Sequence, residues 1–196
     1  YLTESTNKKE LKKSYETESV FAAKLYPAGA TTNSESGVKN ILNIMPILET
    51  MSEIGMPLLI HGEATNKEID IFDREKEFID KTLDVICREL PDLKVTLEHI
   101  TTKDATIYVN EGNKKLSATI TPHHLSLNRN AIFVGGIRPH NYCLPILKRE
   151  IHRKALVKEA ISGNSKFFLG TDTAPHLIYD KENTCGCAGI FNATYC

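Results

Sequence analysis

The sequence predicts an α/β fold built on a parallel sheet. Three observations lead to this prediction: five short runs of nearly continuous apolar residues, longer helical patterns between them, and polar side chains at the carboxyl ends of the runs. Continuous apolar runs are typical of strands buried on both faces, and strands that alternate with helices pair in parallel. The 196 residues contain no internal repeat or linker, so we expect a single domain over 1–196.

The elements are predicted in the following order. Apolar runs predict strands at 20–26, 57–61, 94–99, 116–120 and 167–170. Apolar residues at spacings of three and four predict helices within 41–51, 72–90 and 147–156. Gly55 is a stop for the first helix, and Pro46 inside that pattern either starts the main helix or kinks it.

The composition limits the possible partners. Lys and Arg number 24 against 25 Asp and Glu, and 41% of the residues are apolar, which is typical of a globular chain. Without a positive excess we expect no nucleic-acid partner. Runs such as 56–60 are too short to span a bilayer, and no amino-terminal stretch has the pattern of a signal peptide, so we expect no membrane partner.

The five cysteines are an odd number at low density, which argues against a disulfide framework. The count favours a reducing compartment, so we expect a cytoplasmic protein. Cys185 and Cys187 form a C-x-C pair, but no second pair stands at zinc-finger spacing, and we expect no structural zinc site there.

A parallel sheet of this kind either stays open, as a doubly wound sheet, or closes into a barrel. No glycine-rich phosphate-binding motif follows any predicted strand, so the sequence gives no support for a nucleotide-binding fold. Polar residues at the carboxyl ends of the strands favour the barrel, because barrel active sites are built there. Five strands are fewer than the eight, in roughly 250 residues, of a complete barrel.

Four strand-end side chains suggest metal chemistry: Lys24, His61, His99 and Asp172. Lys24 lies in an apolar strand, where an ammonium is costly unless it pairs with a carboxylate or is modified. Histidines that end two consecutive strands lie close together on one rim, and imidazole is a common ligand of zinc-like metals. An aspartate at this rim could cap the next segment, or act as a ligand or general base. His123, His124, His140 and His152 receive no role.

Several longer strings resemble the dihydroorotase family, in its bacterial-type, stand-alone form. They are AKLYPAGATTN at 23–33, LIHGE at 59–63, EHITTKD at 98–104, RPHNYCLPILK at 138–148, GTDTAPH at 170–176 and CGCAG at 185–189. The resemblance implies an amidohydrolase with a (β/α)8 TIM-type barrel, of which this chain covers roughly strands 4–8. It also implies a homodimer and two Zn²⁺ ions per complete subunit.

The resemblance assigns roles to individual residues. Lys24 matches the carboxylated lysine that bridges both metals, and His61 and His99 match the ligands of one metal. Asp172 matches the catalytic aspartate that binds the other metal and shuttles a proton. The substrate-contacting positions match His61, His176, the backbones of Leu144 and Ala188, and a mobile loop with Thr31 and Thr32. The implied reaction is the reversible cyclisation of N-carbamoyl-L-aspartate to L-dihydroorotate by a metal-activated hydroxide, in pyrimidine biosynthesis.

One departure from the family pattern is large. The family begins its site with a His-x-His pair on the first strand, and these 196 residues contain no such pair. We therefore expect a partial chain that lacks the first strands and the segments after the eighth. Two alternatives stay open: a hydantoinase-like hydrolase of another cyclic amide, and a non-catalytic fragment or pseudoenzyme.

Overall fold

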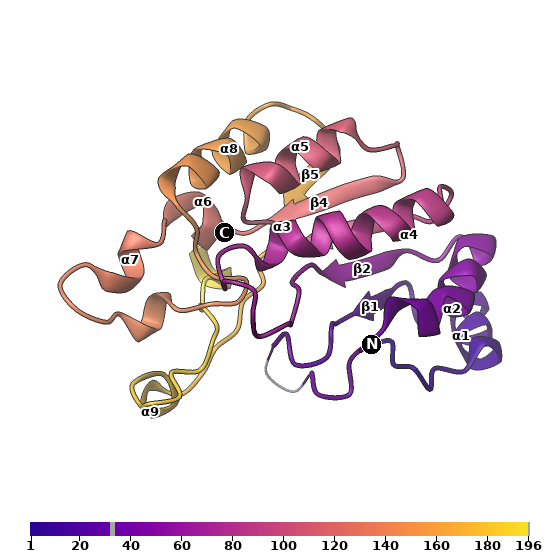
Figure 1. The fold of residues 1–196 in the computed structure, drawn as a ribbon, viewed down its shortest axis with the longest axis horizontal. Helices are drawn as coiled ribbons and strands as arrows, with labels where there is room; N and C mark the ends of the chain where they lie inside the picture. The colour runs from indigo at the N-terminus through magenta and orange to yellow at the C-terminus, as the bar shows by residue number, and fades with distance from the viewer. Residues whose placement is uncertain (32–33, 196) are drawn as a thin grey trace.

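The computed structural model describes residues 1–31 and 34–195 (Figure 1). Its five strands form one parallel sheet in the order β1-β2-β3-β4-β5. The strands are β1 (Ala23–Leu25), β2 (Leu58–His61), β3 (Val95–Glu98), β4 (Leu116–Ile120) and β5 (Phe167–Leu169). All five predicted strands are confirmed, although the first is shorter than expected, because Val20 and Phe21 are exposed before it.

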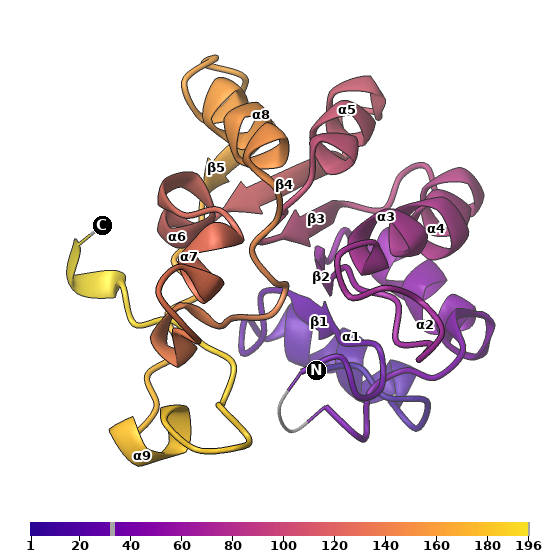
Figure 2. The ribbon, with the colours of Figure 1, turned by 60° about the vertical axis from the view of Figure 1, so that its left-hand side comes forward.

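The strand order decides between the doubly wound sheet and the barrel. A doubly wound sheet reverses its strand order at a switch point, whereas here every strand pairs with the next one in the chain. Figure 2 shows the large helices on one side of a curved row of strands. This is an arc of a (β/α)8-type barrel, and the fold class predicted from the sequence is confirmed.

The helices follow the strands as crossovers. The predicted stripes appear as α2 (Ile41–Ile54), as α8 (Glu150–Ala160), and as a continuous helical run of α3 (Arg74–Phe78), a π-helical turn (Ile79–Leu83) and α4 (Asp84–Glu89). Further helices are α1 (Lys8–Glu16), α5 (Lys103–Glu111), α6 (Pro122–Ser126), α7 (Asn130–Phe133) and α9 (Ile178–Lys181). Short 3-10 turns lie at Pro139–Asn141 and Ala193–Tyr195. In the described part of the chain, no helix has the length and apolar character needed to cross a membrane.

Helix α2 settles the two possibilities for Pro46. The helix begins after Asn40, whose side chain accepts a hydrogen bond from the backbone N–H of Leu42, so it starts before the proline. It continues through Pro46, which is exposed, and ends at Gly55 with a left-handed φ of 73°. Water can therefore satisfy the carbonyl that the proline leaves without a helical partner.

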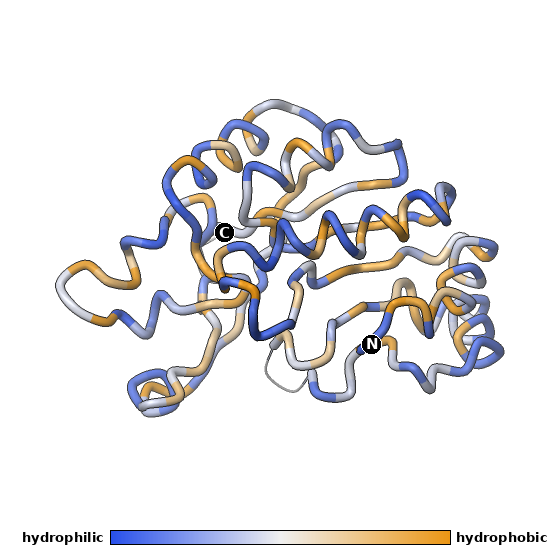
Figure 3. Tube along the Cα trace, in the orientation of Figure 1, coloured by the Kyte–Doolittle hydropathy of each residue, from blue (hydrophilic) through white to orange (hydrophobic). Residues whose placement is uncertain are grey.

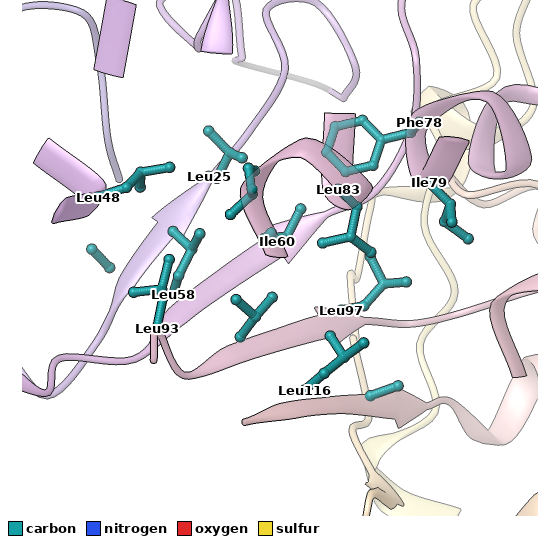
Figure 4. Close-up of a cluster of buried hydrophobic side chains, with 14 of the residues drawn as sticks. Leu25, Leu48, Leu58, Ile60, Phe78, Ile79, Leu83, Leu93, Leu97 and Leu116 are labelled. Atoms are coloured by element: carbon teal, nitrogen blue, oxygen red, sulfur yellow. The ribbon is translucent and has the colours of Figure 1, made fainter. Parts of the chain in front are cut away.

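The core lies between the sheet and the helical layer, and Figure 3 shows the apolar colour concentrated along the strands. Leu58 and Ile60 of β2 and Leu97 of β3 point toward Leu48 of α2 and Leu83 of the π-helical turn (Figure 4). Each such side chain, once buried, contributes about 1.5–3 kcal/mol. Side chains alternate along a strand. On β1 the burial of Ala23 and Leu25 therefore turns Lys24, which lies between them, to the inner face of the arc.

Candidate active site

Parallel pairing brings the four predicted metal-site residues to one rim of the sheet. Lys24 lies on β1, His61 ends β2, His99 follows β3 directly, and Asp172 lies three positions beyond β5. The strand order places β1, β2 and β3 side by side, and Asp172, which follows β5, lines the same cavity as His61 and His99.

His61 and His99 form a buried pair. Nδ1 of His61 and Nε2 of His99 lie 3.2 Å apart, with the ring centroids at 4.7 Å. Nε2 of His61 donates to the carboxylate of Glu63 at 2.8 Å, which leaves the Nδ1 lone pair directed at His99. Two nitrogen ligands at about 2.05 Å from a tetrahedral metal lie about 3.3 Å apart, so the pair has the spacing of two ligands of one ion.

The protonation of His99 fits this arrangement. Burial, followed by the charges of His61 and Lys24, lowers the pKa of His99 well below its ordinary value. A neutral imidazole is the form that binds metals. The loop after His99 is held by Glu75, whose buried carboxylate accepts hydrogen bonds from the backbone and hydroxyl of both Thr101 and Thr102.

Lys24 is paired in the structure. Its ammonium donates to the carboxylate of Glu98, and it lies 4.9 Å from the centroid of the Tyr26 ring. The simpler of the two expectations for this lysine, a carboxylate partner, therefore describes the unmodified side chain. Both partners are largely but not completely covered, with 17% and 25% of their side chains exposed.

Asp172 stands at the open edge of the rim, where its side chain remains accessible to solvent. Partial desolvation and the charge of Glu98 raise the pKa of its carboxyl, and the charges of Lys24 and His61 oppose them. The backbone is left-handed at His99, with φ 44°, and at Asp172, with φ 43°. Such conformations are uncommon outside glycine and are concentrated at functional sites.

A cavity of about 250 Å³ opens at this rim. Seven predicted site residues line it: Thr31, His61, His99, Leu144, Asp172, His176 and Ala188. Nε2 of His176 lies 3.0 Å from the carbonyl oxygen of Ala188, so the two substrate-contacting positions are already in contact. Lys24 is not part of the lining, and Thr32 lies outside the described residues.

A larger cavity of about 540 Å³ lies between the end of β1 and α3. Its lining includes Lys39, Glu77 and Lys81 but none of the four strand-end residues. The chemistry of the strand ends therefore favours the smaller cavity as the candidate active site.

Some residues of the rim were not found from the sequence. Tyr26 and Cys143 line the cavity, Glu63 orients His61, and Glu98 pairs with Lys24. Glu63 had a usable signal, because it follows a strand-end histidine by two positions. The partners of Lys24 and the neighbours of Cys143 depend on tertiary packing, for which a single sequence offers no local signal.

His123 and His124 are both buried and lie outside the cavity lining. Together with Cys143 they place ligand-type atoms within 4.8 Å of one another. However, both ring nitrogens of His124 already contact hydrogen-bonding partners, Thr121 and the carbonyl of Pro145. Burial raises the pKa of the Cys143 thiol to about 12, and its sulfur donates to the carbonyl oxygen of Pro145 at 3.3 Å, so the group forms part of the hydrogen-bonded core.

Comparisons with known proteins agree with this fold. The model of the amidohydrolase family matches residues 3–194. A dihydroorotase of Aliivibrio fischeri is 60% identical over 193 residues, which are 98% of this chain and 56% of the relative. A dihydroorotase of a Synechococcus species is 60% identical over 196 residues, covering 100% of this chain and 56% of the relative. The chain thus spans about half the length of the curated relatives that it matches.

Solved structures give the same result. A dihydroorotase of Saccharomyces cerevisiae in complex with 5-fluoroorotic acid is 34% identical with a TM-score of 0.88, covering 97% of this chain and 56% of that one. A Campylobacter jejuni dihydroorotase is 39% identical with a TM-score of 0.83, covering 95% of this chain and 52% of that one. Since the family model extends over nearly every residue, the chain belongs to the amidohydrolase family.

Proposed function

We propose that this chain is part of a dihydroorotase, which interconverts N-carbamoyl-L-aspartate and L-dihydroorotate in pyrimidine biosynthesis. One observation carries the proposal: His61, His99, Asp172 and His176 converge on one cavity, in a chain 60% identical to dihydroorotases. The cavity volume of about 250 Å³ suits a small polar substrate.

The proposed metal site uses Lys24 in carboxylated form, together with His61, His99 and Asp172, to hold two Zn²⁺ ions. The facing lone pairs of His61 and His99 and the neutral state of His99 support this ligand set. Bound divalent cations supply Lewis acidity and lower the pKa of a water molecule. Among the described residues, Lys24, His61 and His99 would hold one ion, and Lys24 and Asp172 would hold the other.

The side chains of the chain then handle the substrate and its proton. A carboxyl with a raised pKa exchanges protons more readily near neutral pH, which suits Asp172 for carrying a proton to the ring nitrogen that leaves during hydrolysis. We assign the substrate carboxylate to His176, and the substrate's polar edge to the backbones of Leu144 and Ala188. Thr31 and Thr32 belong to the loop that we expect to close over the bound substrate.

The test of the activity is turnover by the complete gene product. It should hydrolyse dihydroorotate and leave hydantoin unchanged. Hydantoinases share the fold, with D-hydantoinase at 18% identity and a TM-score of 0.75, so fold alone does not separate the two activities. Preferred turnover of hydantoin would replace the proposal with the first alternative. Absence of metal and of any turnover would favour the non-catalytic one.

Lys24→Ala tests the metal bridge. The variant should lose bound zinc and activity together, and added short carboxylic acids should restore part of both by replacing the bridging carboxylate. Lys94→Ala is the control, because Lys94 lies at the amino end of β3, on the opposite rim, where its ammonium donates to the carbonyl of Gly55. Full activity in Lys24→Ala without rescue would exclude the bridge.

We further propose a cytoplasmic homodimer. In the described ranges Cys87, Cys143, Cys185 and Cys187 are free thiols, which supports a reducing compartment. The homodimer rests on the family resemblance. Light scattering of the complete gene product measures its mass directly, and a monomer at micromolar concentration would contradict the prediction.

A further inference from the structure

Lys181 is a buried lysine that the proposed chemistry does not use. It is the last residue of α9, and only 4% of it is exposed although α9 lies at the periphery of the molecule (Figure 1). Its ammonium donates to the carbonyl oxygens of Tyr142 at 3.0 Å, Gly189 at 2.8 Å and Cys187. An ammonium has three N–H groups, so this one is fully satisfied by backbone.

The three carbonyls belong to two segments that meet beside the cavity. Tyr142 precedes Leu144 by two positions, and Cys187 and Gly189 flank Ala188. Both Leu144 and Ala188 line the cavity. The two segments are joined directly by a hydrogen bond from the N–H of Gly189 to the Tyr142 carbonyl, at 2.9 Å.

The second segment also passes close to Ala174 and His176. A Cβ at Gly189 would lie 2.7 Å from the Cβ of Ala174 and 2.9 Å from the ring of His176. Only a residue without a side chain fits between Gly189 and these neighbours, and Lys181 ties the carbonyl of Gly189 to those of Tyr142 and Cys187. A neutral side chain of this length cannot donate three hydrogen bonds, which is the reason for a lysine at this point.

We propose that Lys181 is a positioning residue, whose ammonium fixes 142–144 and 187–189 so that the cavity wall is formed before substrate arrives. The inference about substrate rests on the proposed function. The inference about the two segments does not.

The experiment compares Lys181→Met with Lys166→Met in the complete gene product. Lys166 is a matched control, because its ammonium also donates to three carbonyls, those of Val109, Asn110 and Gly112, but it does so before β5, at the amino end of the strand. Lys181→Met should raise the KM for dihydroorotate on the order of tenfold to a hundredfold, with a smaller change in kcat, since misplaced binding groups lower substrate affinity. Lys166→Met should leave KM unchanged, and Lys181→Arg should recover part of the wild-type KM.

Hydrogen exchange supplies a readout that does not depend on activity. The amide of Gly189 should exchange faster in Lys181→Met than in the wild type, and at the wild-type rate in Lys166→Met. Equal KM and equal exchange in Lys181→Met and the wild type would overturn the proposal, as would the same changes in both variants. Should Lys181→Met not fold, Lys181→Gln is held to the same two measurements. If the wild type does not act on dihydroorotate, the proposed function fails, while the exchange experiment still decides the role of Lys181.

Discussion

The buried carboxylate of Glu63 accepts a hydrogen bond from Nε2 of His61 and leaves Nδ1 of that ring facing His99. Both partners are only 1% exposed, so their relative orientation is fixed by packing as well as by the hydrogen bond. A carboxylate behind a metal-binding histidine sets the tautomer and increases the basicity of the ligand nitrogen.

Glu63→Gln should therefore weaken zinc binding by about 10- to 100-fold, the usual effect of removing such a partner. Competition with a chelator of known affinity measures the change. Glu53→Gln, on the exposed surface of α2, is the control and should bind zinc as the wild type does. Unchanged affinity in Glu63→Gln would contradict the role of the carboxylate.

The buried histidines give a pH dependence of stability. Burial lowers the pKa of His123 to about 4 from an ordinary 6.5, so the ring stays neutral in the folded state. Above pH 6.5 the ring is neutral in both states, whereas between 6.5 and about 4 only the unfolded chain takes up the proton. Stability must fall as the pH falls through this window, by at most about 3 kcal/mol for this one residue. Urea unfolding of the complete gene product from about pH 7 to about pH 4.5 should show this slope, and His123→Gln should reduce it. An identical slope in the variant would contradict the assignment.

Single residues also mark what the sequence could and could not predict. The shared location of Lys24, His61, His99 and Asp172 was predictable, because parallel strands bring their carboxyl ends to one rim. The left-handed backbone at His99 and Asp172 was not, because the φ angle of a non-glycine residue is set by its surroundings rather than by its identity.

At the scale of elements, α2 contains a residue that destabilises the helix. Pro46 occupies an exposed position inside the helix, where it lacks an N–H and disfavours the helical conformation of the residue before it. Pro46→Ala should stabilise the protein by about 2 kcal/mol, after allowance for the greater freedom of the unfolded chain. Thermal unfolding of the complete gene product measures the effect, and a lower melting temperature in the variant would show that the proline has a packing role.

The loop that carries Ala188 depends on a glycine. Gly189 has φ 152°, and a Cβ there would lie 2.7 Å from both the carbonyl oxygen and the Cβ of Ala174. Gly189→Ala should displace Ala188 and raise the KM for dihydroorotate. Gly163→Ala is the control, because Gly163 also has a positive φ, 77°, but no atom near the added Cβ. Equal KM in both variants would show that the close approach at Gly189 does not position substrate.

Elements were predictable where burial leaves a periodic pattern, and α1 shows the opposite case. Helix α1 has no fully buried residue and packs only Leu11 and Tyr15 against the core, so its apolar stripe is too short to predict a helix. The predicted start of the first strand was wrong for a related reason. Val20 and Phe21 are apolar enough for a strand, yet they precede the residues that pair with β2, and Phe21 is 74% exposed. Local composition does not specify which neighbour a segment will find.

At the scale of the whole molecule, β5 is an edge strand of the sheet, and it exposes apolar side chains. Phe168 is 48% exposed and Leu169 is 55% exposed, and the strand pairs only with β4 among the described residues. In a closed barrel both edges of every strand are paired. We expect residues 1–196, expressed alone, to aggregate or to lack activity, because unpaired edges and exposed apolar side chains promote association. Light scattering and zinc content per chain test this expectation. A monodisperse protein with two zinc ions and normal turnover would contradict it.

The proposed ligands lie on four separate strand ends, from Lys24 near the start of the chain to Asp172 near its end. A zinc finger can be nucleated by its metal because its ligands are close in sequence, whereas here no two ligands are local. A metal held by these residues would therefore bind after the strands have paired and would not guide their pairing. Refolding of the complete gene product should accordingly show two kinetic phases: a zinc-independent phase in which secondary structure forms, followed by a slower phase in which metal is captured and activity returns.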